Sequence, residues 1–409
     1  MKSPELVLPA GDLEKLKTGC LFGADAVYLG GQEYSLRAYA GNFSLKEISI
    51  GVELARQQRK KVYVAVNVLA RNSDLKSLPE YLEFLAYLGV DGLIVSDPGV
   101  MKMAGRYAPM LPITISTQAS VSNYESAQFY RDLGAKRIVL ARELSLDEIS
   151  EIKSRVDIEI EIFVHGAMCV SYSGRCLLSH YMVGRSGNRG ECAHPCRYSY
   201  RLVEEKRAGE YFPIHEDEQG SYILNSRDLC LIEHLPQLME RGIDAFKIEG
   251  RMKSPLYVAS TAATYRSAID HYTATGQEFI QSELDSWIRE LAGTASRPFT
   301  NGFIEGESSL LQDINKDPQL GRLDFCGVVK AYHQDTKMLE IEQRANFGRG
   351  EHMELMLPQQ GIKRLELSSM FDMEGMPIER ARHAKQRVFI PYPEPCPEYS
   401  ILRRAGADN

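Results

Sequence analysis

The feature that most constrains the fold is a repeated pattern of a short strand-like run, a polar loop and a helical stretch, over the first ~250 residues. Eight runs rich in β-branched and other apolar residues are predicted strands: Glu5–Leu8, Ala26–Leu29, Val62–Val66, Gly92–Val95, Ile113–Ser116, Arg137–Leu140, Ile158–Val164 and Ala245–Glu249. Helical stretches lie between most of them, such as Asp12–Phe22, Leu45–Gln57, Leu78–Leu88, Asn123–Leu133 and Ser145–Ser154. Such alternation is typical of a parallel sheet, and eight units predict a closed (β/α)8 barrel of the TIM type.

An open, doubly wound α/β sheet is the structural alternative. Such folds carry a G-x-G-x-x-G phosphate-binding turn after the first strand. Here the first strand is followed by Pro9-Ala10-Gly11-Asp12, which lacks that spacing. The sequence therefore favours the barrel.

A long insertion interrupts the pattern between the seventh and eighth strands. About 80 residues separate Val164 from Ala245, and five of the eight cysteines fall among them. Long insertions at one strand–helix connection usually carry function. We therefore predict a barrel domain over residues 1–310 that includes a Cys-rich insertion over residues 165–235.

The composition of the chain changes after the barrel. Two helical segments, Tyr257–His271 and Phe279–Leu291, are followed by short β-like runs at Cys326–Tyr332, Met338–Gln343, His352–Leu357, Gly361–Glu366 and Arg387–Ile390. Short runs separated by Gly and Asn turns predict a small all-β, barrel-like domain over residues 320–396. Residues 397–409 are predicted to be a loosely held tail.

The overall composition is that of a soluble globular protein. Apolar residues make up 44% and charged residues 25%, which excludes a disordered, collagen-like or coiled-coil chain. No run is long enough to cross a membrane, and the N-terminus lacks the pattern of a signal peptide, so a cytoplasmic protein is expected. The net charge of −7 argues against a protein that coats nucleic acid, but it leaves room for a local basic site.

The five clustered cysteines are the strongest chemical signal. They are Cys169, Cys176, Cys192, Cys196 and Cys230. Clustered thiols in a cytosolic chain indicate a metal site or catalysis rather than disulfides. Structural zinc sites usually show two tight Cys pairs, whereas here only Cys192 and Cys196 are close, so the spacing favours an iron–sulfur cluster over zinc. Buried thiols and a nucleophilic cysteine are the alternatives.

Polar residues follow the predicted strands at the end where barrel enzymes hold their active sites. Glu249 and His165 are the candidate catalytic residues, and the candidate substrate-binding residues are Asn67, Gln118, Arg142, Lys247 and Arg251. Alternation places Lys247, Glu249 and Arg251 on one face of the eighth strand and its exit. An arginine fork suits a carboxylate ligand. The alternatives are a structural ion-pair network for the charged row and a hydrogen-bonded core position for His165.

The insertion is also rich in arginine and tyrosine. Arg185, Arg189 and Arg197 are interleaved with aromatic residues, a composition that stacks unpaired bases and contacts phosphates. We predict that these arginines bind RNA. The alternative is an ordinary solvated surface.

Several of these segments resemble the blocks of a known family. Glu161 to Ser179 is similar to the signature E-x-F-x-x-G-[SA]-x-C-x₄-G-x-C-x-x-S of the collagenase-like peptidase U-32 family. Cys192–Arg197 and Asp244–Ser254 resemble its other blocks, so the likeness covers nearly the whole chain. In length and layout the chain is similar to the tRNA hydroxylation members. That resemblance implies formation of 5-hydroxyuridine at the wobble position of tRNA, dependence on prephenate and a four-iron four-sulfur cluster.

The resemblance also implies which residues hold the cluster. Cys169, Cys176 and Cys192 match three ligands, and both Cys196 and Cys230 match the fourth, with Cys230 preferred. The implied partners are tRNA and prephenate, and a second protein of the same family could share the work. Basic residues of the β-rich segment are expected to contact the tRNA body.

Two other functions are weighed against RNA hydroxylation. The family label suggests a peptidase, but the chain has neither a G-x-S-x-G elbow nor an H-E-x-x-H motif. A non-catalytic scaffold stabilised by a metal such as zinc is the third possibility. Iron and sulfide content separates the first function from the third, and metal-independent peptide cleavage would support the second.

Overall fold

In a computed structural model, the chain folds around a closed barrel of parallel strands. The structure describes residues 3–35, 42–168, 173–185, 192–193, 195, 216–217, 220–221, 227–306 and 323–404. The eight barrel strands are β1 Glu5–Pro9, β2 Ala26–Gly30, β3 Lys61–Val66, β4 Gly92–Val95, β5 Ile113–Ile115, β6 Arg137–Val139, β7 Glu159–Ala167 and β11 Ala245–Ile248. Each pairs in parallel with its neighbour, and β11 closes the barrel by pairing with both β1 and β7. The predicted (β/α)8 barrel is confirmed.

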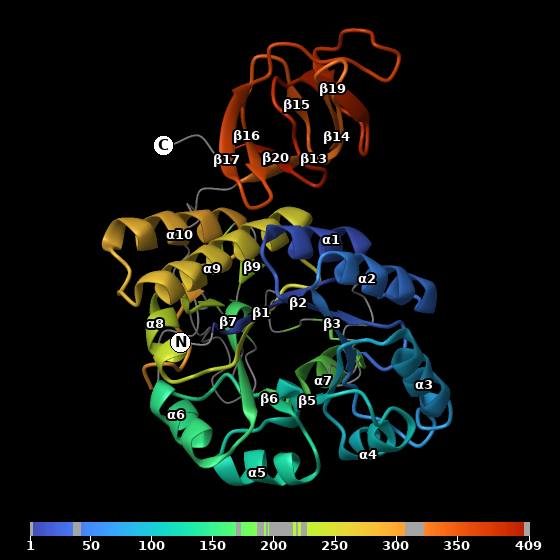
Figure 1. Cartoon of the computed structure of the whole chain (residues 1–409), viewed down its shortest axis with the longest axis vertical. Coiled ribbons are helices and arrows are strands. Elements are labelled where there is room, and N and C mark those ends of the chain that lie inside the picture. The colour runs from blue at the N-terminus through green and yellow to red at the C-terminus, as the bar shows by residue number, and fades with distance from the viewer. Residues whose placement is uncertain are drawn as a thin grey trace, which may run out of the picture.

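Helices surround the barrel (Figure 1). They are α1 Leu13–Phe22, α2 Leu45–Gln57, α3 Leu78–Leu88, α4 Pro98–Tyr107, α5 Tyr124–Asp132, α6 Leu146–Arg155, α8 Leu235–Glu240, α9 Pro255–Thr275 and α10 Gln281–Thr294. Side-chain caps fix where several begin: Ser44 with Glu47, and Ser145 with Glu148, form capping boxes at α2 and α6. These caps stand at the sequence positions where the polar loops give way to amphipathic stretches.

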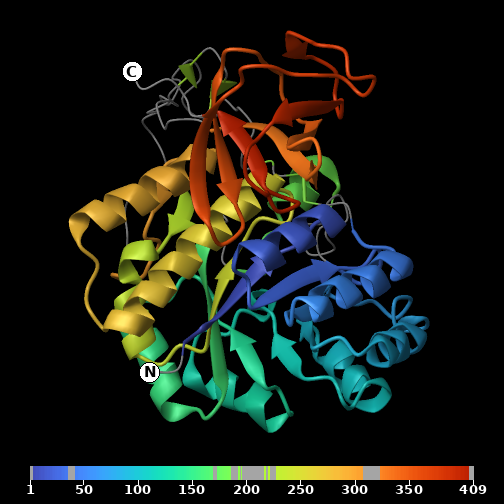
Figure 2. The ribbon, with the colours of Figure 1, turned by 45° about the horizontal axis from the view of Figure 1, so that its top comes forward.

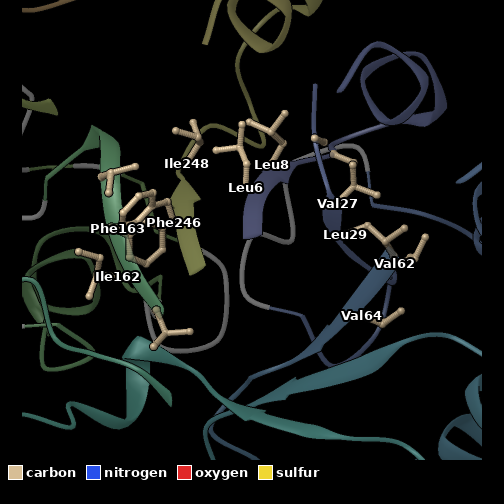
Figure 3. Packing of buried hydrophobic residues seen from close by; sticks show 14 of the residues in the cluster. Leu6, Leu8, Val27, Leu29, Val62, Val64, Ile162, Phe163, Phe246 and Ile248 are labelled. Carbon is tan, nitrogen blue, oxygen red and sulfur yellow. The ribbon is translucent and has the colours of Figure 1, made fainter. Parts of the chain in front are cut away.

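The strands bury two different faces. One face packs against the helices, with contributions such as Leu6, Leu8, Val27 and Leu29, and Figure 3 shows these apolar side chains on neighbouring strands. The alternate residues fill the barrel interior in a separate, smaller cluster of Val7, Ala26, Tyr28, Tyr63, Ile94 and Ala245. This separation follows from the period of two in a strand.

The end of β7 carries strands that the sequence pattern did not predict. β10 (Asp228–Cys230) runs antiparallel to the end of β7, and the short β12 (Phe299–Thr300) pairs with β10. The insertion before β10 contains α7 (Leu178–Val183) and a small hairpin of β8 (Glu216–Asp217) and β9 (Gly220–Ser221). The 3-10 turn η1 (Thr117–Ala119) follows β5, and the 3-10 turn η5 (Ile232–His234) precedes α8.

The C-terminal region is an antiparallel all-β unit, as predicted. Its larger sheet has the order β17-β16-β20-β13-β14-β19, and β15 pairs with β18. The strands are β13 Asp324–His333, β14 Met338–Gln343, β15 Phe347–Gly348, β16 His352–Leu357, β17 Gly361–Glu366, β18 Arg380–Ala381, β19 Arg387–Pro391 and β20 Ile401–Arg404. The prediction of a loose tail is wrong for Ile401–Arg404, because β20 pairs with both β13 and β16 and its apolar side chains are buried.

The β unit packs on the barrel's helices rather than hanging from them. Figures 1 and 2 show it beside α1, α9 and α10. Its residues Val328, Met356 and Ile401 belong to the same apolar cluster as the barrel core. The Arg403 guanidinium, which is 2% exposed, binds Glu290 of α10 at 2.5 and 2.8 Å. Within the described ranges, no helix combines the length and apolar character needed to span a bilayer.

Candidate active site

A pocket opens at the carboxyl ends of the barrel strands, with about 680 Å³ of empty space that includes open solvent. Its lining includes six of the seven residues predicted from strand ends: Asn67, Gln118, Arg142, Lys247, Glu249 and Arg251. Tyr28, Ala65, Ile94, Ser116, Thr117, Val139, Phe163 and Cys192 complete the lining. The mixed polar and apolar wall is typical of a small-molecule site. The structure thus brings these residues together, while their individual roles stay predictions.

Lys247 lines this pocket and is almost fully buried. Its Nζ is 2.7 Å from Oε1 of Glu161 and 4.2 Å from the centre of the Tyr28 ring. The second carboxylate oxygen of Glu161 is 3.0 Å from the Arg137 guanidinium. Because a buried ammonium needs a charged partner, Glu161 stabilises a positive charge beneath the pocket.

Glu249 and Arg251 continue the row beyond β11. The Tyr28 hydroxyl lies 3.2 Å from Oε2 of Glu249 and 3.1 Å from the Ile248 carbonyl oxygen. The Arg251 guanidinium is buried and donates to Oγ of Ser35 at 3.0 Å. The structure therefore holds a carboxylate and a guanidinium in fixed positions at the pocket wall.

Arg142 occupies the wall formed by β6 and β7. Its guanidinium lies over the Phe163 ring, 4.3 Å from the ring centre, and Nη1 donates to the Ala167 carbonyl oxygen at 2.5 Å. Stacking and one hydrogen bond leave a planar fork whose other N–H groups can serve an anionic ligand. Together with Arg251 and Lys247, Arg142 gives the pocket three cationic side chains.

The two amide side chains follow β3 and β5, which lie on either side of β4 in the barrel. Asn67 comes directly after β3, and its Nδ2 lies 3.5 Å from Oγ of Ser116. The backbone carbonyl oxygen of Asn67 accepts a hydrogen bond from the Ser96 hydroxyl. Gln118 lies in η1, whose first turn is capped by Ser116. These amides can orient the polar groups of a bound molecule without adding charge.

His165, a predicted catalytic residue, does not line this pocket. It is 1% exposed and faces α9, where Nδ1 lies 3.3 Å from the Tyr265 hydroxyl. Its ring also packs against Tyr257 and Phe299. Burial, with a smaller contribution from Lys253, lowers the pKa of His165 to about 3. The structure agrees with the alternative interpretation, a hydrogen-bonded histidine in the core.

The described cysteines differ in their surroundings. Cys192 lines the pocket, and Cys176 is half-buried on the segment that leads to α7. Cys230 lies opposite His165 in the β7–β10 pair, with its Sγ 3.8 Å from the Tyr265 hydroxyl, and burial raises the pKa of its thiol to about 11. Cys169 and Cys196 lie outside the described residues. In the part of the chain that the structure describes, no three His, Cys, Asp or Glu side chains gather as a metal site.

The donor chemistry of this segment still suits a soft metal. Thiolates are the ligands that iron–sulfur clusters use, and the pocket wall carries one thiol directly, on Cys192. In the sequence, Cys169 comes two residues after the end of β7. The thiol of Cys192 is thus a soft-metal donor at the pocket wall.

The start of the insertion is attached to the rim by hydrogen bonds. The Ser173 amide donates to Glu143 at 2.9 Å, and the Ser120 hydroxyl donates to the Ser173 carbonyl oxygen. A side chain at Gly174 would collide with the Gln118 carbonyl oxygen, which lies only 2.2 Å from the site of a Cβ. Of the predicted RNA-binding arginines, Arg185 is half-buried just after α7, whereas Arg189 and Arg197 lie outside the described residues.

Sequence reasoning missed Tyr28, Phe163, Glu161 and Arg137. A signal was present for Glu161, because β7 reads Glu-Ile-Glu-Ile-Phe and a strand with alternate carboxylates indicates a charged barrel interior. No comparable signal identifies Tyr28 or Arg137. Their importance depends on which residues face them across the barrel.

Comparisons with known proteins identify a family and several relatives of this chain. A model described as peptidase family U32 matches residues 11–312, and one described as the peptidase family U32 C-terminal domain matches residues 322–403. The tRNA hydroxylation protein P1 of Bacillus subtilis is 42% identical over 95% of this chain and 91% of its own length. The tRNA hydroxylation protein P of Escherichia coli is 35% identical over 99% of this chain and 97% of its own. The 23S rRNA 5-hydroxycytidine C2501 synthase of Escherichia coli is 38% identical over 65% of this chain and 39% of its own.

Proposed function

This chain belongs to peptidase family U32, and we propose that it is an RNA-modifying enzyme that hydroxylates a tRNA uridine to 5-hydroxyuridine. The observation that carries the proposal is the cationic pocket at the barrel rim, which holds Lys247, Arg142, Arg251 and Glu249 beside Cys192. Relatives that match nearly the whole chain are named as tRNA hydroxylation proteins, and a further relative as an rRNA hydroxycytidine synthase. A wobble uridine suits this enzyme because unpaired loop bases can be splayed out and read.

Prephenate is the proposed cosubstrate. It carries two carboxylates, and the pocket supplies two guanidinium groups and one ammonium. Arg142 offers a planar fork stacked on Phe163, and Lys247 offers a point charge deeper in the pocket. Bidentate and charge-assisted hydrogen bonds of this kind are the strong ones for carboxylates.

A four-iron four-sulfur cluster is the proposed cofactor. Cys169, Cys176 and Cys192 would hold it, with Cys196 or Cys230 as the fourth ligand. When bound, such a cluster would supply one-electron transfer or an iron with an open coordination position. Zinc is the alternative metal, and iron and sulfide content distinguishes the two.

The chain's own residues would bind and orient the reactants. Lys247, Arg142 and Arg251 would fix the anionic cosubstrate, and Asn67 and Gln118 would contact its polar groups or those of the uracil. Glu249 is the carboxylate in the pocket lining, and it would hold or move a proton beside the bound reactants. Arg185, Arg189 and Arg197 are proposed to contact the phosphates of the RNA loop.

A peptidase is the second candidate, and the family description is what favours it. Cysteine or serine peptidases need a nucleophile with a base within hydrogen-bond reach. The residues that line the described pocket include no histidine, and His165 faces α9 instead. The pocket therefore supports hydroxylation better than peptide hydrolysis.

The test combines chemistry with genetics. Protein purified without air should be brown and contain about four irons and four sulfides per chain. Cells that lack the gene should lose 5-hydroxyuridine-derived nucleosides in their tRNA, and the wild-type gene should restore them, whereas Lys247→Met should not. Restoration by the Lys247→Met variant, or peptide cleavage that survives Cys192→Ser and removal of iron, would contradict the proposal.

A further inference from the structure

A column of charged side chains runs through the barrel interior from its amino end to the pocket. Glu5 begins β1, and its Oε1 lies 2.8 Å from the Arg137 guanidinium. Arg137 also binds Glu161 at 3.0 Å, and Glu161 binds Lys247 at 2.7 Å. Lys247 is the member of this column that reaches the pocket.

The column is balanced in charge and shielded from water. It contains two carboxylates and two cations, and their side chains are 11% exposed at Glu5, 8% at Arg137, 1% at Glu161 and 5% at Lys247. Burial opposes charge on the Glu5 carboxyl, but the Arg137 guanidinium together with hydrogen bonds from Lys61 and Tyr63 outweighs it, so the pKa of Glu5 lies below its usual value. Buried ions of this kind are stable only while each keeps its partner.

Glu161 controls the position of the Lys247 ammonium. The ammonium can donate three hydrogen bonds, and one of them is directed to Glu161. The ring centres of Tyr28 and Phe163 lie 4.2 and 5.8 Å from Nζ, so aromatic rings stand beside it. Because Glu161 takes one N–H group and the Tyr28 and Phe163 rings stand beside the ammonium, the remaining N–H groups can donate only toward the pocket.

We propose that Glu161 is a positioning residue, which sets through Lys247 the place where the pocket binds a carboxylate of the small-molecule cosubstrate. Glu161 does not line the pocket itself, and Arg137 occupies its second oxygen so that only one oxygen serves Lys247. This inference rests on the proposed function, because the carboxylate is that of prephenate. Glu161 would thus influence binding of the cosubstrate although it does not contact the cosubstrate itself.

The experiment compares Glu161→Gln with Glu5→Gln. Both changes remove one carboxylate charge from the same column and from a contact with Arg137, but only Glu161 touches Lys247. For Glu161→Gln we expect KM for prephenate in tRNA hydroxylation to rise roughly tenfold or more, with kcat changed less than about threefold, because a charge-assisted contact that fixes a binding group is weakened. For Glu5→Gln we expect KM to change less than about twofold.

A structural role alone would give a different pattern. If the column served only stability, both variants would lower the melting temperature and neither would raise KM selectively. Equal effects of the two variants on KM, or an unchanged KM in Glu161→Gln, would overturn the proposal.

A second measurement is independent of the enzyme's activity. Lysine acylation of the folded proteins, read by peptide mass spectrometry, reports how firmly Lys247 is held. We expect the acylation rate at Lys247 to rise several-fold in Glu161→Gln and to stay at the wild-type rate in Glu5→Gln, because only the first change frees the amine. If wild-type protein forms no 5-hydroxyuridine, the proposed function fails while this measurement still decides the role of Glu161. Equal rates in all three proteins would exclude it.

Discussion

At the scale of single residues, the close fit around Arg251 explains why a glycine ends β2. A Cβ at Gly30 would lie 2.1 Å from the Arg251 Nη1 and 2.0 Å from Oγ of Ser35. The same two atoms form the hydrogen bond that holds Arg251 at the pocket wall. Gly30 therefore acts by leaving space rather than by adopting an unusual backbone conformation.

Gly30→Ala should displace Arg251 from the pocket. We expect a loss of about 1–3 kcal/mol in stability from overpacking and a rise in KM for prephenate. Gly105→Ala is the matched control, because no atom lies within 4 Å of a Cβ at that position in α4. Steady-state kinetics and thermal unfolding of both variants check this, and wild-type kinetics in Gly30→Ala would show that Arg251 has room to move.

The thiols should divide into two classes by reactivity. Burial raises the pKa of Cys20 to about 12 and that of Cys326 to about 11, so both should resist alkylation at neutral pH. Cys176 and Cys192 are half-buried, and they should react only after a chelator has removed the proposed cluster. Mass spectrometry of alkylated peptides with and without chelation measures this. Equal labelling of Cys176 and Cys192 in both samples would argue against their role as ligands.

At the scale of elements, one buried arginine links α10 to the β unit. Arg403 of β20 binds Glu290 of α10 and, through Nε, Glu354 of β16 at 3.0 Å. The Ser260 hydroxyl of α9 also donates to Glu290 at 2.5 Å. Four elements, two of the barrel and two of the β unit, thus share a single ionic centre.

Glu290→Ala should loosen this contact because it leaves part of a buried guanidinium without its partner. We expect a loss of about 3 kcal/mol in the free energy of unfolding, measured by chemical denaturation. Arg364→Met serves as the control: Arg364 lies 3.7 Å from the same Glu354, but its side chain is 89% exposed, so its loss should have little effect. Comparable destabilisation by the two variants would show that burial does not govern this ionic centre.

At the scale of the whole molecule, charge pairing limits where RNA can bind. Many basic residues of the β unit are already paired with acidic neighbours, as Lys330 and Arg344 are with Glu14, and Arg387 is with Glu340. Lys363 likewise pairs with Glu394. These pairs reduce the basic surface that the β unit offers, so we expect the arginines of the insertion to make more of the proposed RNA contacts.

The salt dependence of tRNA binding should reflect this restricted basic surface. Each phosphate contact to single-stranded RNA contributes about 0.7 to the slope of log affinity against log salt, so a few arginines predict a slope of roughly 2–4 in magnitude. Filter binding or fluorescence titration over a range of salt concentrations gives the slope. Arg185→Ala should reduce it by about 0.7, whereas a slope near 10 in the wild type would require a much larger basic face.

The sequence by itself determined the barrel, most element boundaries and six residues of the pocket. Strand and helix periodicity are local, and in a parallel barrel the carboxyl ends of all strands meet at one rim, so Asn67, Gln118 and Lys247 could be placed together without knowing their contacts. The all-β C-terminal unit followed from the same local patterns.

The tertiary structure alone decided which side of β7 His165 faces, and which residues stand behind Lys247. Strict alternation would put His165 on the side of Glu161 and Phe163, but the pairing of β7 with β11 shifts register between Lys247 and Ile248, and His165 faces α9. The contact of Lys247 with Glu161 joins residues 86 positions apart. Likewise, β20 pairs with β13 and β16, which come earlier in the chain. Such contacts depend on how distant segments pack, which no local pattern encodes.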